Sequence, residues 1–172
     1  VSTNPADPLR GNVRAVLEQR PDYRNQLAIS NRFVQHISQF DAALHLNYKF
    51  SFDDWGINAH TFEGDWIQPL FDGWTLTPRI RYYSQSAADF YQPYLISNQA
   101  FFKTQLYDPT KLPQDFASDH RLASFGSLSG GVTLNKRLVR GIELEAGFEY
   151  YTRASSFAFS GGNSSFADFD YY

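Results

Sequence analysis

The 172-residue chain lacks cysteine and methionine, and it has no run of about 18 consecutive apolar residues. Without cysteine, it can form neither a disulfide nor a thiolate metal site. Without a long apolar run, it cannot contain a transmembrane helix, whereas a β-barrel stays possible because its polar inward half offsets its apolar half. Because a natural chain begins with methionine, we expect that the N-terminus has been processed or is missing, and no signal-peptide pattern precedes Val1.

An excess of basic charge is absent as well. The formal net charge is −3 and the pI is about 5.7, which argues against a nucleic-acid partner because such a partner requires a basic face. The mean hydropathy is −0.43, although hydrophobic residues make up 42% and aromatic residues 17% of the chain. Barrels place such aromatic residues in girdles at the two membrane interfaces. The length is enough for one domain but not for two large ones.

The clearest pattern is an alternation over 42–52, with an aromatic group toward one end. Ala42, Leu44, Leu46, Tyr48, Phe50 and Phe52 share one parity, and Ala43, His45, Asn47, Lys49 and Ser51 share the other. Because successive side chains of a strand point to opposite faces, the pattern predicts a strand with one apolar and one polar face. The alternation returns over 142–153. Both stretches have the length that is typical of a membrane-spanning strand.

Weaker patterns predict further strands over 23–36, 55–67, 74–83 and 124–135, and the start of another over 169–172. A helix over 26–37 is an open alternative for the first of them. The strand over 55–67 has mixed parity. We therefore expect a β-bulge between Ala59 and Phe62, which would turn Phe62 and Trp66 outward and the neighbouring carboxylates inward.

The predicted connections sort by length. Segment 1–22 is read as loop and strand start, the long loops are 84–120 and 154–168, and the short turns are 38–41, 53–54, 69–73 and 136–141. Every long loop falls at one end of the sheet, as in outer-membrane barrels, so we expect the two long loops outside the cell and the basic turn 136–141 in the periplasm. The predicted fold is an all-β, antiparallel transmembrane β-barrel, seen as a partial barrel of about seven strands. A soluble β-sandwich is the alternative, disfavoured because its strands are usually shorter.

Several motifs together resemble the bacterial outer-membrane family catalogued as domain of unknown function 3570. They are RPDYR at 20–24, DWGI at 54–57, HT at 60–61, WIQP at 66–69, GWTL at 73–76, RYYSQSAADFY at 81–91, GGVTL at 130–134, LEAGFEYYT at 144–152 and ADFDYY at 167–172. The resemblance implies that 1–172 is the C-terminal part of a single barrel domain in the outer membrane of a Gram-negative bacterium. The family has no settled activity. Its genes often lie near those of a flavin transferase, a small lipoprotein and a thioredoxin-like protein, which implies a role in envelope redox chemistry.

Strand parity assigns the candidate site residues to two faces. We expect His45, Asn47, Lys49, His60, Arg79, Arg81, Glu143, Glu145 and Glu149 to face the lumen, and Leu44, Leu46, Tyr48, Phe50, Leu144 and Phe148 to face lipid. The lumen charges either line a selective pore or neutralise one another in a plugged lumen. His45 and His60 could approach on the inner face, but a metal needs a third ligand, so we favour two solvated histidines and no metal.

Exposed aromatic side chains mark interfaces, so Phe90, Tyr91 and Tyr94 are candidates for contact with a partner. The favoured alternative is that these rings pack inside their loop or fold into the mouth of the barrel. The chain has no phosphate-binding glycine loop, haem-attachment motif or zinc spacing, so we expect no cofactor.

We predict a porin-like conduit or scaffold that is not itself catalytic and whose partner is outer-membrane lipid. One alternative is a component of an envelope electron-transfer or redox complex, bound to a periplasmic or surface protein. A soluble sandwich that serves as a binding module is another. A membrane-embedded hydrolase built on Asp119-His120 is disfavoured because no Gly-x-Ser-x-Gly elbow is present.

Overall fold

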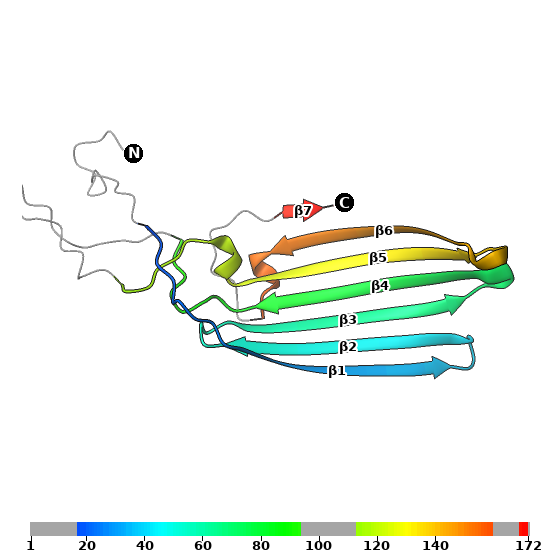
Figure 1. Ribbon diagram of the computed structural model, residues 1–172, viewed down its shortest axis with the longest axis horizontal. Coiled ribbons are helices and arrows are strands. Elements are labelled where there is room, and N and C mark those ends of the chain that lie inside the picture. Colours follow the sequence, from blue (N-terminus) through cyan, green and yellow to red (C-terminus); the bar gives the residue numbers. More distant parts are fainter. Residues whose placement is uncertain (1–16, 94–112, 160–168, 172) are drawn as a thin grey trace, which may run out of the picture.

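The computed structural model describes residues 17–93, 113–159 and 169–171. They form one antiparallel sheet whose seven strands follow one another in chain order, six of them long and the last short (Figure 1). The strands are β1 (Gln26–Ile37), β2 (Ala42–Asp53), β3 (Asn58–Pro69), β4 (Trp74–Gln85), β5 (Phe125–Arg137), β6 (Glu143–Ala154) and β7 (Phe169–Tyr171). The short 3₁₀ turns are η1 (Phe71–Gly73), η3 (His120–Leu122), η4 (Val139–Gly141) and η5 (Ser155–Phe157).

The all-β, antiparallel prediction is confirmed, but within the described residues the sheet is open and not closed into a barrel. β1 and β7 are its two edges, and each pairs with one neighbour only. β1 pairs with β2 along its whole length, from Gln26 opposite Asp53 to Ile37 opposite Ala42, so the helix alternative over 26–37 is wrong. No helix in the described ranges is long and apolar enough to cross a membrane.

The pairing register assigns every strand residue to one of two faces, because residues directly opposite each other in antiparallel strands point the same way. We call the face that carries Leu44, Leu46 and Tyr48 the apolar face. We call the face that carries His45 and Asn47 the polar face. The alternation predicted for β2 and β6 therefore has a structural counterpart on every long strand of the sheet.

The expected bulge in β3 is absent. β3 pairs with β2 without interruption from Asn58 to Ile67, so Phe62 and Trp66 lie on the apolar face in regular register. The conflict in parity came from Ile57, which belongs to the preceding turn, where its N–H donates to the Asp53 carboxylate at 2.9 Å. An irregularity does occur at Pro78, since a proline cannot donate to a ladder and the pairing of β3 with β4 skips from Asp65 to Gln68.

The connections sort by end, as expected. The turn between β1 and β2, η1 and η4 lie at one end of the sheet, which we call the turn end, at the right of Figure 1. The connections from β2 to β3, β4 to β5 and β6 to β7 lie at the other, the loop end. At the turn end, Asp72 and Gly73 both have positive φ, and the Lys136 ammonium donates to the Asp72 carboxylate at 2.8 Å.

The loop end holds the main buried apolar cluster of the described residues. Ile57, Ala88, Ala117 and Leu122 are buried together, and Trp55, Phe90 and Tyr91 pack against them. We call these seven residues the loop-end cluster. They come from the turn after β2 and from both described arms of the long connection between β4 and β5, so that connection folds back onto the strand ends.

Candidate functional site

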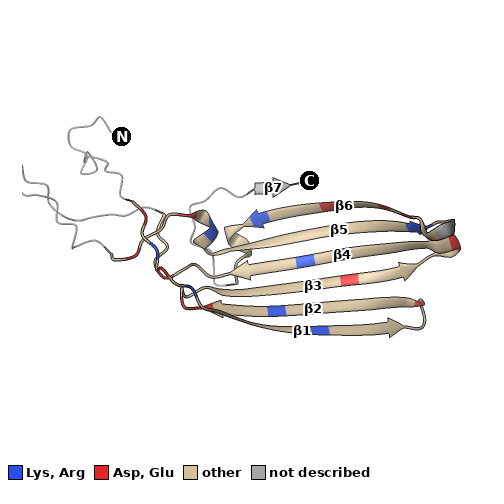
Figure 2. Ribbon diagram, viewed as in Figure 1, with Lys and Arg blue, Asp and Glu red and all other residues tan. Residues whose placement is uncertain are grey.

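The polar face carries charged and hydroxyl side chains in rows that cross the sheet. One row runs from His45 through Asp65 and Arg79 to Glu149, and the next runs from Asn47 through Glu63, Arg81 and Ser129 to Tyr151. The charged positions on β1 to β4 lie in a band across the middle of the sheet (Figure 2). Eight of the nine candidate lumen residues share this face: His45, Asn47, Lys49, Arg79, Arg81, Glu143, Glu145 and Glu149.

Two ion pairs join β3 and β4 within these rows. Arg79 Nε lies 2.6 Å from Asp65 Oδ1, and Arg81 Nε lies 3.1 Å from Glu63 Oε1. The arginines therefore find carboxylates on the neighbouring strand, which sequence parity left undecided. This arrangement matches the alternative in which arginine and acidic side chains neutralise one another, but the pairs form along the sheet surface.

A hollow of about 290 Å³ opens on the polar face over β4, β5 and β6. Its lining combines two serines, one arginine, one carboxylate and three aromatic rings: Arg81, Tyr83, Phe125, Ser127, Ser129, Glu149 and Tyr151. Sequence analysis selected only Arg81 and Glu149 among these residues. The others were missed because an uncharged serine, tyrosine or phenylalanine on the polar parity of a strand gives no signal of its own.

His60 is the exception among the candidate lumen residues. It lies on the apolar face opposite Phe50, while His45 lies on the polar face, so the two histidines cannot share a metal through the inner face. His60 Nδ1 is 2.9 Å from the Tyr48 hydroxyl, and the ring of Phe159 meets the imidazole edge-on at 5.6 Å. No group of three or more potential metal ligands occurs in the part of the chain that the structure describes.

The apolar face holds all six candidate lipid-facing residues: Leu44, Leu46, Tyr48, Phe50, Leu144 and Phe148. Several of its aromatic side chains pack against one another. Phe62, Tyr82 and Phe159 pack together near the loop end, and Phe40 and Trp66 pack edge-on near the turn end. Phe159 reaches this face because the segment after β6 folds over it, where the Tyr82 hydroxyl donates to the carbonyl of Phe157 at 2.5 Å.

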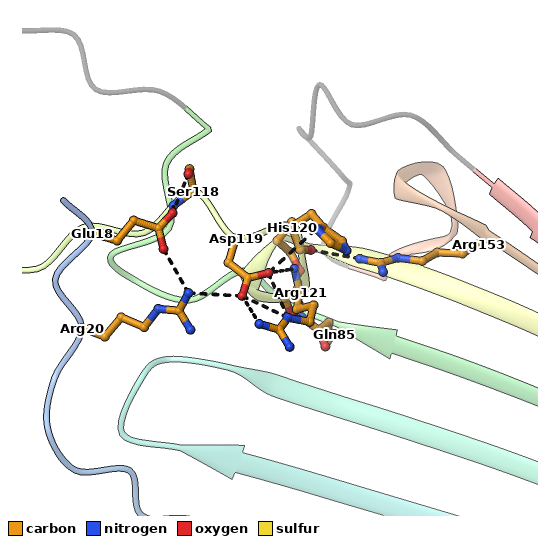
Figure 3. Close-up of polar contacts among 9 residues, drawn as sticks. Glu18, Arg20, Gln85, Ser118, Asp119, His120, Arg121 and Arg153 are labelled. Atoms are coloured by element: carbon orange, nitrogen blue, oxygen red, sulfur yellow. Dashed lines mark hydrogen bonds and ion pairs between the residues drawn. The ribbon is translucent and has the colours of Figure 1, made fainter. Parts of the chain in front are cut away.

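A network of charged groups closes the loop end beside the polar face (Figure 3). The Asp119 carboxylate accepts hydrogen bonds from the backbone and guanidinium of Arg121 and from Arg20, which lies 99 positions away in the chain. Glu18 accepts from the backbone N–H and the hydroxyl of Ser118. The network therefore ties the segment before β1 to the returning arm of the long connection.

These contacts perturb the two carboxylates in the same direction. The hydrogen bonds from Arg121 hold the pKa of Asp119 well below its usual range, although the partial burial of the carboxylate opposes the shift. The hydrogen bonds from Ser118 lower the pKa of Glu18. Both side chains are therefore carboxylates at neutral pH, and both act as acceptors that hold the loop end together.

The same network contains Asp119 and His120, the residues of the disfavoured hydrolase, together with Ser118. His120 Nδ1 lies 3.8 Å from Asp119 Oδ1, which is beyond hydrogen-bond distance, and the hydroxyl of Ser118 donates to Glu18 at 2.6 Å. A nucleophilic serine must instead give its proton to a base that a third group orients. The structure brings these residue types together without giving them those roles.

The aromatic partner candidates lie at the loop end. Phe90 meets Trp55 edge-on with the ring centroids 5.2 Å apart, and Tyr91 packs against the loop-end cluster. The two rings thus pack against the turn after β2 as well as against their own connection, and contact with a partner stays a prediction. Tyr94 lies outside the described residues.

Comparison with known proteins identifies a family. Searches of curated proteins and of solved structures gave no match. The sequence model of the family described as protein of unknown function (DUF3570) matches residues 1–172. The match spans the described strands and the segments between them, and the chain belongs to this family.

Proposed function

We propose that this chain forms part of a transmembrane β-barrel in the outer membrane of a Gram-negative bacterium, where it acts as a conduit or scaffold and not as a catalyst. The observation that carries the proposal is the exposed apolar face. Leu46, Ile80 and Phe148 are 44%, 58% and 61% exposed, although water does not favour a surface of this kind. A hydrocarbon environment would remove that cost.

The dimensions of the strands support the same reading. β2 has 12 residues. At about 3.3 Å per residue a strand of this length extends about 40 Å, and at a tilt of about 45° it rises about 28 Å, close to the hydrocarbon thickness of about 30 Å.

The arrangement of aromatic side chains supports it as well. On β2, β3 and β4, Leu46, Gly64 and Ile80 lie side by side between the Phe62–Tyr82 pair and Trp66, although the same row carries Phe33 on β1 and Tyr150 on β6. Membrane barrels have an apolar band between two aromatic girdles because aromatic rings favour the headgroup level. The polar face would then line the lumen, with its ion pairs facing water or one another.

The open edges of the sheet set a requirement for this proposal. A strand in lipid must pair all its backbone N–H and C=O groups, since no water can replace a missing partner. β1 offers a free edge of 12 residues. Closure of the barrel therefore calls for further strands, from the same polypeptide or from another copy.

The proposal is tested by spin labels on two neighbouring positions of β2. Residues 1–172 contain no cysteine, so Leu46→Cys and Asn47→Cys each introduce a single labelling site within this range. Both variants are made in the full protein. In lipid vesicles, a label at position 46 should be relaxed by oxygen, which concentrates in hydrocarbon, and shielded from a water-soluble nickel chelate. The label at position 47 should show less oxygen relaxation. A label at position 46 that meets the chelate more readily than oxygen would overturn the proposal.

A further inference from the structure

The hollow on the polar face has unused hydrogen-bonding groups on its floor. Ser127 and Ser129 are 7% and 5% exposed, and their hydroxyls have no hydrogen-bond partner among the described residues. The two residues point the same way, because they are two positions apart on β5. A hydroxyl can donate once and accept twice, so the pair offers several bonds to a ligand.

The walls add one carboxylate and one arginine. Glu149 makes no hydrogen bond or ion pair with any described residue, and Arg81 is paired through Nε with Glu63 at 3.1 Å. Arg81 can donate and Glu149 can accept, so a ligand hydroxyl placed between them finds both kinds of partner. Both side chains are exposed, so they can meet a ligand that enters from water, and a few polar groups of this kind fix its orientation.

The charges around the hollow balance. The two charged residues that line it, Arg81 and Glu149, carry opposite charges, and each also interacts with an oppositely charged side chain, Glu63 for Arg81 and Arg79 for Glu149. An anionic ligand would meet the carboxylate of Glu149, and a cationic ligand would meet the guanidinium of Arg81. The site therefore disfavours both and suits a neutral ligand that is rich in hydrogen-bonding groups.

Three aromatic rings complete the lining. Tyr83 and Phe125 lie with their ring centroids 5.6 Å apart, and Tyr151 stands on the neighbouring strand opposite Ser129. One face of Phe125 is covered by the Arg153 guanidinium, whose Cζ lies 3.4 Å from the ring centroid, so only its other face is open to a ligand. The face of an aromatic ring is negative, so it attracts the weakly positive C–H groups on the flat side of a pyranose. At about 290 Å³ the hollow is at the small end of ligand pockets, which matches one or two sugar rings.

We propose that this hollow is a binding site for a neutral saccharide. The serine hydroxyls, Arg81 and Glu149 bind its hydroxyl groups, and the aromatic rings pack against its C–H face. The inference rests on the proposed function in one respect only: the polar face must line a water-filled lumen, so that a saccharide can reach the hollow. A lumen lined by the polar face would then bind a neutral saccharide in preference to charged solutes of similar size.

The test measures binding of glucose and maltose to the full protein in detergent by saturation-transfer NMR. We expect both sugars to bind, and the Ser127→Ala/Ser129→Ala double variant to lose about tenfold or more in affinity because two hydrogen bonds are lost. The control is Ser30→Ala, which also lies on the polar face but belongs to β1. Absence of sugar binding by the unchanged protein, or full binding by the double variant, would overturn the proposal.

A second arm tests the charge argument with gluconate and glucosamine. Both should bind more weakly than glucose to the unchanged protein, and Glu149→Gln should raise the affinity for gluconate while glucose still binds. Gluconate that binds more tightly than glucose to the unchanged protein would contradict a neutral ligand. Sugar binding with failed spin-label results would retain the site and reject the barrel, and the reverse pattern would retain the barrel and reject the site.

Discussion

The loop-end cluster and the apolar face of the sheet use the same kinds of side chain in opposite ways. At the loop end, Ile57 and Leu122 are 5% and 6% exposed, covered by segments distant in sequence. On the sheet, Leu46 and Ile80 lie in regular register with no layer of the described residues over them. The loop end buries its apolar surface under other segments of the chain, whereas the middle of the sheet leaves its apolar surface exposed.

The two regions also place their charged groups differently. Burial at the loop end is accompanied by polar contacts of the kind that water-exposed segments use, such as those of Asp119 with Arg20 and Arg121. The charges of the long strands lie on the polar face, except for Lys136 near the turn end, which shares the apolar face with Trp74 and Leu144.

The largest effect is expected from labelling the two ends on intact cells. Gln114→Cys lies in the returning arm of the long connection and Val139→Cys lies in η4, and both positions are exposed. If the loop end faces the surroundings, an impermeant thiol reagent should modify the first and reach the second only after the outer membrane is opened. The opposite order would invert the orientation.

The next effect is expected from a charge on each face of β2. Leu46→Arg should reduce the free energy of unfolding by about 2 to 4 kcal/mol in a reversible lipid refolding assay, because it places a cation in hydrocarbon. Asn47→Arg, one position away on the polar face, is the matched variant and should cost much less. Equal losses would show that the two faces meet the same solvent.

A cavity in the loop-end cluster should have a smaller and local effect. Leu122→Ala removes buried methyl groups and should cost about 2 kcal/mol in the stability of the loop end. Hydrogen exchange should show faster opening of the segments around η3 and unchanged protection in the middle of β2. Leu138→Ala, at an exposed leucine of the turn end, is the control. Faster exchange throughout the sheet would show that the two regions are one cooperative unit.

The smallest effect is expected from acid at the loop end. The pKa of Asp119 is lowered in the folded protein by the bonds from Arg121, so its contribution is present above the ordinary aspartate range and is lost as the pH falls toward the lowered value. Exchange of the amide of Arg121, measured relative to its intrinsic rate, should therefore accelerate below pH of about 4. Asp119→Asn should reduce this pH dependence, and an unchanged profile in that variant would assign it to another group.

Much of the sheet could be predicted from the sequence because a strand carries its own period. The alternation over β2 and β6 identified the two faces before any partner strand was known. The same reasoning failed at β3, since it counted Ile57 as part of the strand when that residue belongs to the turn. His60 was misplaced for the same reason, because its facing was tied to the parity of Ile57.

The candidate site could be predicted only in part. The charged rows follow from parity, but the register that joins Arg79 to Asp65 depends on where each turn begins and ends. The loop-end network was not foreseeable, since it joins Arg20 to Asp119 across 99 positions with no periodic signal between them. The fold of Phe159 over the apolar face is likewise a long-range contact that local pattern cannot show.

Pro78 has a mechanical consequence for the hairpin of β3 and β4. The ladder between these strands resumes beyond the proline with only the pairs Gln68–Leu76 and Pro69–Thr75 before the chain turns back. Two residue pairs resist separation only weakly, so force applied at η1 should separate β3 from β4 there before it reaches the ion pair of Arg79 and Asp65. The pairing of β3 with β4 is therefore weakest near the turn end, and we expect the register of its loop-end half to persist after the turn-end pairs have separated.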